Sequence, residues 1–107
     1  MTREKRAAKN EALFREVNER IKELSLAQLS EHSDVLCECS ERDCMATVQV
    51  TVGEYEDVRA HGTRFVIVAG HEDPSIERVV DRNERFVIVE KTAPEAAAEA
   101  RRRDPRS

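Results

Sequence analysis

The sequence predicts an α+β domain in which a long N-terminal helix packs on a small, mainly antiparallel sheet, with a short helix between strands. Two observations lead to this fold class. Apolar residues recur at helical spacing near the N-terminus, and β-branched residues gather in several short segments farther along the chain. The 107 residues are expected to form one domain.

The first predicted element is a helix over about residues 4–29. Its large apolar residues recur at steps of three and four residues and therefore share one helix face: Leu13, Phe14, Val17, Ile21 and Leu24. We expect this face to cover the sheet of the same domain. The alternative interpretation is a helix that binds a protein partner, or that pairs with a second copy in a homodimer.

The middle of the chain is predicted to contain strands and one short helix. A short strand ends at Leu36, and residues 46–51 alternate between apolar and polar side chains, as a half-buried strand does. Thr51 and Glu54 have the spacing of a capping box, which predicts a helix from Val52 to about residue 60.

Three further strands are expected over residues 64–69, 76–81 and 85–90. The first is a continuous apolar run, which indicates a central strand buried on both faces. Asn83 is suited to the turn of a hairpin between the other two strands. Three strands in succession predict an antiparallel meander.

Charge and composition favour a cytoplasmic protein that does not bind nucleic acid. The net charge is −4, and residues 31–60 carry eight acidic but only two basic groups, which is the opposite of a nucleic-acid footprint. The longest apolar run, residues 65–69, is too short to span a membrane. An odd number of cysteines in one cluster, without a signal peptide, indicates reduced thiols and not disulfides.

Cys37, Cys39 and Cys44 all lie within eight residues and predict a structural zinc site. Thiolates and imidazoles are the donors that structural zinc prefers, and four of them surround the ion in a tetrahedron. Three thiolates can come from this one segment if the chain reverses between the second and third cysteine. A fourth donor must then come from elsewhere in the chain.

We favour His71 as the fourth ligand, because it follows a buried strand and Gly70, which lets the backbone fold close to the cysteines. His61 lies at an expected helix end, where its ring can interact with the last carbonyls, and His32 lies in a polar segment before the cysteines. Both remain alternatives. The predicted fold is therefore an α+β domain with one structural zinc site.

Several segments resemble a group of small uncharacterised, mainly actinobacterial proteins. These segments are residues 10–21, 37–39, 70–72, 77–80 and 89–91, and the likeness extends over most of residues 8–92. The pattern of that group, Cys-x-Cys…Cys…Gly-His-Glu, implies the ligand set Cys37, Cys39, Cys44 and His71. The resemblance implies no activity.

The two ends are predicted to lie outside the packed region. Residues 1–9 are expected to be a flexible basic end, and residues 10–92 a single zinc-stapled domain. Residues 93–107 form an Ala/Arg-rich tail with a capping-box pattern at Thr92, which predicts a marginal, solvated helix.

These observations favour a non-enzymatic zinc protein that contacts a protein partner or serves a regulatory role. No catalytic triad order, phosphate-binding glycine loop or deaminase motif is visible in the sequence. One alternative is a redox sensor that uses Cys37 and Cys39, although the acidic residues Glu38, Glu41 and Asp43 disfavour reactive thiolates. A nucleic-acid-binding zinc protein is a weaker alternative.

Overall fold

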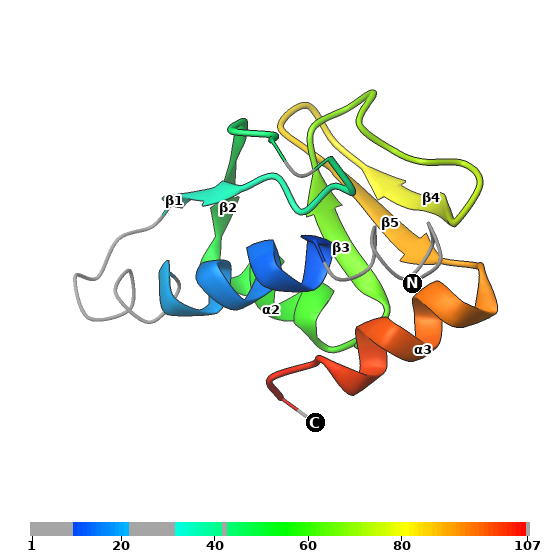
Figure 1. Ribbon diagram of the computed structural model, residues 1–107. Helices are drawn as coiled ribbons and strands as arrows, with labels where there is room; N and C mark the ends of the chain where they lie inside the picture. Colours follow the sequence, from blue (N-terminus) through cyan, green and yellow to red (C-terminus); the bar gives the residue numbers. More distant parts are fainter. Residues whose placement is uncertain (1–9, 22–31, 42, 107) are drawn as a thin grey trace.

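The computed structural model describes residues 10–21, 32–41 and 43–106. The first helix is seen over residues 10–21, and the elements that follow it are β1 (His32–Leu36), β2 (Thr47–Thr51), α2 (Val52–Arg59), β3 (Arg64–Ile67), β4 (Glu77–Arg82), β5 (Val87–Lys91) and α3 (Pro94–Arg102). The strands form two antiparallel sheets, β1–β2 and β3–β5–β4 (Figure 1). The α+β prediction is confirmed, with two small sheets in place of one.

The first helix is confirmed as helical over residues 10–21, and the rest of its predicted range lies outside the described residues. The described part of this helix is shorter than the long helix that was predicted. The predicted flexible end, residues 1–9, also lies outside the described part, so the domain boundaries stay a prediction. No helix within the described ranges has the length and hydropathy needed to cross a membrane.

The predicted meander is wrong in its strand order, because β5 lies between β3 and β4. Asn83 shapes the β4–β5 hairpin through its side chain, whose Oδ1 accepts hydrogen bonds from the backbone N–H groups of Arg85 and Phe86 at 2.8 and 2.9 Å. β3 then pairs with the other edge of β5. Three consecutive apolar residues of β5 are buried, as expected of a central strand: Val87, Ile88 and Val89.

β3 is consequently an edge strand, although its apolar residues are buried as predicted. Its outer edge bonds to the cysteine segment. The N–H of Glu38 donates to the carbonyl of Val66 at 2.8 Å, and the N–H of Val66 donates to the Glu38 carboxylate at 3.0 Å. The cysteine segment thus takes the place of a neighbouring strand.

The predicted N-terminal capping box is present in α2 and absent in α3. The capping box of α2 is confirmed, since Thr51 and Glu54 bond reciprocally at 3.0 and 2.8 Å. α3 has no side-chain cap, because Ala93 and not Thr92 is its N-cap residue. α3 is also not solvated: Ala96 and Ala100 are fully buried, because alanine lets the helix approach the sheet closely.

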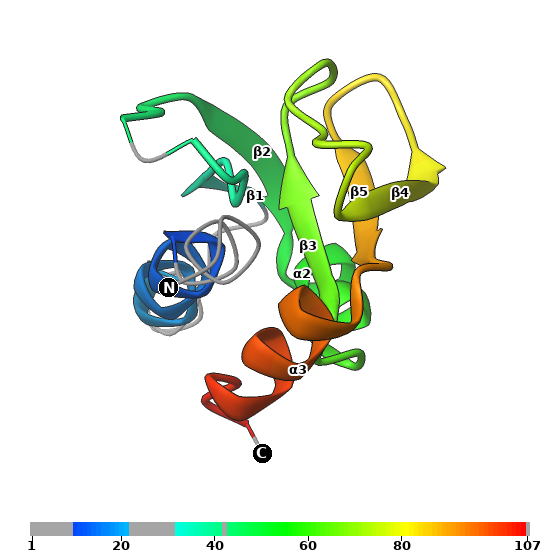
Figure 2. The ribbon, with the colours of Figure 1, turned by 45° about the vertical axis from the view of Figure 1, so that its right-hand side comes forward.

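The first helix docks through polar side chains, contrary to the expected apolar face. Glu11, Arg15 and Asn18 are each 0% exposed, whereas Leu13 is 58% and Val17 38% exposed. Figure 2 shows this helix almost end-on, on one side of β3, with the β4–β5 hairpin on the other side. Ile21 packs against the core, Phe14 is half-buried, and Leu24 lies outside the described residues.

Specific partners explain why the polar face is buried. The guanidinium of Arg15 donates to the carbonyls of Gly62 and Ala100, both at 2.7 Å, and lies 4.6 Å from the centre of the Phe65 ring. Glu11 forms a buried ion pair with Lys91, which also pairs with Glu77. Buried charged groups are tolerated only with such partners.

We predict that Glu11→Gln stabilises the protein more as the pH rises. One ammonium, that of Lys91, faces two buried carboxyl groups, and burial raises the pKa of Glu11 well above its ordinary value, with Glu77 adding to the rise. Between the unfolded and folded pKa values the folded state binds more protons, so its stability falls as the pH rises through that window. A neutral amide removes this loss.

Urea unfolding of both proteins at pH 5, 6.5 and 8 measures the effect. The stability of the variant relative to the parent should rise from pH 5 to pH 8, because the parent alone has a buried carboxyl group that binds its proton more tightly in the folded state. Glu16→Gln, at an exposed position on the same helix, is the control. A stability difference that does not change with pH would contradict the argument.

Candidate metal centre

The cysteine segment runs from the end of β1 to the start of β2 and is fixed by backbone hydrogen bonds. The N–H of Cys37 donates to the carbonyl of Ala46 at 2.9 Å, and the N–H of Cys44 donates to the carbonyl of Glu41 at 3.1 Å. These bonds reverse the chain between Cys39 and Cys44, as the zinc prediction requires. Arg42, within this turn, lies outside the described residues.

His71 reaches the cysteines from the loop after β3. The backbone N–H of His71 donates to the carbonyl of Val68 at 3.0 Å, and this bond closes a tight turn. Gly70 within that turn has φ of 92°, a left-handed conformation that residues with a Cβ rarely adopt. The backbone N–H of Val68 also donates to the Cys37 sulfur at 3.2 Å, so the loop that contains His71 also bonds to Cys37.

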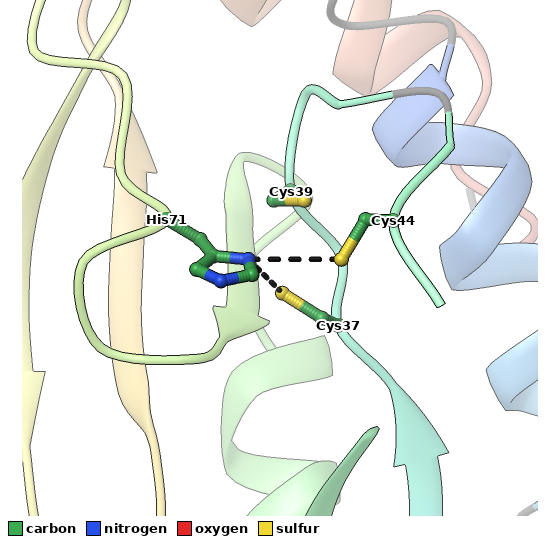
Figure 3. Close-up of side chains that lie close together, drawn as sticks. All are labelled: Cys37, Cys39, Cys44 and His71. Carbon is green, nitrogen blue, oxygen red and sulfur yellow. Dashed lines mark hydrogen bonds between the residues drawn. The ribbon is translucent and has the colours of Figure 1, made fainter. Parts of the chain in front are cut away.

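The four predicted ligand residues come together in the structure. Their ligand atoms all lie within 4.8 Å of one another, and His71 Nδ1 is 3.6 Å from the sulfurs of both Cys37 and Cys44 (Figure 3). Tetrahedral zinc with ordinary bond lengths would separate sulfur from nitrogen by about 3.6 Å and two sulfurs by about 3.8 Å. The side chains need to move by no more than about 1 Å to reach that geometry.

The other histidines do not join this group within the described residues. His61 is exposed just after α2 and is not part of the cluster. The side chain of His32 lies outside the described part, so that alternative stays open. All three cysteines are free thiols, which agrees with the expectation of no disulfide framework.

Burial differs strongly across the cluster. Cys37 and Cys39 are each 1% exposed, Cys44 is half-buried, and His71 is exposed beside a groove of about 460 Å³. Burial raises the pKa of the Cys37 and Cys39 thiols, although the N–H of Val68 opposes this at Cys37. A bound cation is what would make these buried sulfurs ionise.

Sequence reasoning missed the importance of Glu38, which lies between two of the cysteines. It is 0% exposed, and its carboxylate accepts hydrogen bonds from the Val66 N–H, the Asn18 amide and the Tyr55 hydroxyl at 3.0, 2.8 and 3.0 Å. The one available signal was alternation: in an extended chain neighbouring side chains point to opposite sides. Because Cys37 and Cys39 both face the four-residue cluster, Glu38 between them turns to the opposite side, into the interior.

Glu72, the residue directly after His71, is half-buried. Its Oε1 is buried and has no hydrogen-bond partner among the described residues. It is not one of the four clustered residues. The arrangement can bind a cation with four side chains drawn from two loops.

Comparisons with family models, curated proteins and solved structures find no match for this chain. The likeness to the actinobacterial group therefore stays a prediction.

Proposed function

We propose that the chain binds one structural Zn²⁺ through the sulfurs of Cys37, Cys39 and Cys44 and through His71 Nδ1. The observation that carries this proposal is the convergence of the four ligand atoms within 4.8 Å. Three thiolates and one imidazole are a donor set that favours zinc over harder cations such as Mg²⁺ or Ca²⁺. Bound zinc would supply charge neutralisation and a cross-link between two loops.

On this proposal the protein is a non-enzymatic, cytoplasmic module that contacts a protein partner. Four protein ligands fill a tetrahedral ion, so no coordination position remains for a substrate. The apolar side chains of Leu13 and Val17 on the first helix supply exposed contact area for a partner.

Metal analysis with a pair of histidine variants tests the ligand set. The purified parent should contain one zinc per chain, and His71→Ala should weaken zinc binding about tenfold or more, since a water molecule would replace the imidazole. His61→Ala is the matched control and should bind zinc like the parent. Stoichiometric zinc with unchanged affinity in His71→Ala would transfer the fourth position to another donor.

Removal of zinc by a chelator should destabilise the fold. The groove beside Cys44 and His71 gives a chelator access to the site. We expect the melting temperature to fall by roughly 10 °C or more, because about 1 kcal/mol corresponds to 4–8 °C for a domain of this size and structural zinc contributes several kcal/mol. Melting is followed by circular dichroism. An unchanged curve after complete zinc removal would contradict the structural role.

Alkylation separates the structural site from the redox-sensor alternative. In the zinc form the thiolates are ligands, so iodoacetamide should label the cysteines slowly, and labelling should accelerate once zinc is removed. Mass spectrometry of the native protein gives both rates and shows which cysteine reacts. Rapid labelling of Cys37 or Cys39 with zinc still bound would favour the sensor.

A further inference from the structure

We propose that zinc binding and docking of the first helix are coupled, so that zinc occupancy controls whether this helix stays on the domain. Asn18 and Glu38 are the positioning residues that link the two events. The inference rests on the proposed zinc site and names its regulation. It follows from three features of the contact between the helix and the cysteine segment.

The first feature is that the helix bonds to the chain directly before Cys37. The Asn18 amide accepts a hydrogen bond from the N–H of Leu36 at 2.7 Å and donates to the carbonyl of the same residue at 2.8 Å. One side chain thus satisfies both backbone groups of the residue that precedes the first ligand. The position of Cys37 therefore depends on the helix.

The second feature is the buried carboxylate between two ligands. Glu38 accepts a hydrogen bond from Asn18 at 2.8 Å, while its flanking residues Cys37 and Cys39 face the metal side. Asn10 lies on the same helix, eight residues before Asn18. Its side-chain amide donates to the carbonyl of Ser40, the residue directly after Cys39, at 3.4 Å. The helix contacts the cysteine segment before, between and after its first two ligands.

The third feature is the polar nature of the docking face. Glu11, Arg15 and Asn18 are completely buried, and the large apolar residues of the described helix are exposed or only partly buried. A hydrogen bond contributes about 1 kcal/mol when its geometry is good, whereas a buried polar group that loses its partner costs about 1–3 kcal/mol. Of these three residues, Asn18 is the one that bonds to the cysteine segment, so a displacement of that segment leaves a buried amide without its partners.

These features define two states. With zinc bound, the Cys37–Cys39 segment has a fixed position and the polar face of the helix fits it. Without zinc, the segment keeps its hydrogen bonds to Ala46 and Val66 but lacks the metal cross-link, so it shifts more readily. A shift breaks the bonds of Asn18 to Leu36 and Glu38 and favours release of the helix. Thermodynamic linkage is reciprocal: the factor by which bound zinc strengthens helix docking equals the factor by which a docked helix strengthens zinc binding.

The decisive measurement is zinc affinity, by competition with a chromophoric chelator, for the parent, Asn18→Ala and Glu38→Gln. Asn18→Ala should weaken zinc binding about tenfold or more, in the range seen when residues behind metal ligands are removed. Any loss of folding stability also lowers apparent zinc affinity. Controls of matched stability are therefore needed.

Ile76→Val and Ile76→Ala are suitable controls. Ile76 packs with Ala96 in a small buried cluster separate from the one that contains the cysteines. The two substitutions bracket the loss of stability expected for Asn18→Ala, as judged by urea unfolding of the zinc forms. The coupling is supported if Asn18→Ala loses clearly more zinc affinity than a control of equal stability, and it is overturned if the losses are equal.

Hydrogen exchange supplies a readout that does not depend on affinity. Zinc removal should increase the exchange rates of the amides of residues 10–21 by a larger factor than those of the amides of β3 and β5. Equal acceleration in the helix and the sheet would overturn the inference, because it would mean a single cooperative unfolding. A parent that binds no zinc overturns the proposed function as well, whereas zinc binding without specific coupling overturns only this inference.

Discussion

The outer edge of β3 is the constraint on which the rest of the structure depends. An edge strand leaves backbone N–H and C=O groups unpaired, and these groups must find partners when the strand is buried. Here the partner is Glu38, through both its N–H and its carboxylate, and just beyond the strand the N–H of Val68 donates to the sulfur of Cys37. Because the strand edge fixes Cys37 and Glu38, it also fixes the direction in which the neighbouring side chains point.

A buried carboxylate follows directly from this arrangement and determines how the first helix docks. An ionisable group with no exposed surface needs several donors, and Glu38 obtains them from β3, α2 and the first helix. The helix consequently presents Asn18 inward, and residues one and two turns earlier, Arg15 and Glu11, are buried with it. Interactions of this kind add little net stability, because the cost of removing the polar groups from water offsets most of their attraction.

Local patterns in the sequence predicted what local chemistry decides. The capping box at Thr51, the alternation in β2 and the grouping of Cys37, Cys39 and Cys44 in one turn all depend on short stretches of chain. The helix periodicity correctly gave a helix. It could not show which face is buried, because periodicity contains no information about distant partners.

Those partners are far away in the sequence. Glu11 pairs with Lys91, and Arg15 bonds to the carbonyl of Ala100, which are separated from the helix by most of the chain. The position of β5 between β3 and β4 was unpredictable for the same reason, since a hairpin fixes only one of the two edges of a strand. Burial of the alanines in α3 depends in turn on the sheet that they contact.

The distribution of the ligands explains why a metal, and not a disulfide, suits this site. All three cysteines belong to the connection between β1 and β2, so any disulfide among them would close only a short loop within one segment and restrict the unfolded chain little. His71 alone comes from the connection that follows β3, in the other sheet. An ion that accepts both sulfur and nitrogen would cross-link these two connections, so on the proposed function His71 is the residue that gives the cysteine cluster a structural role.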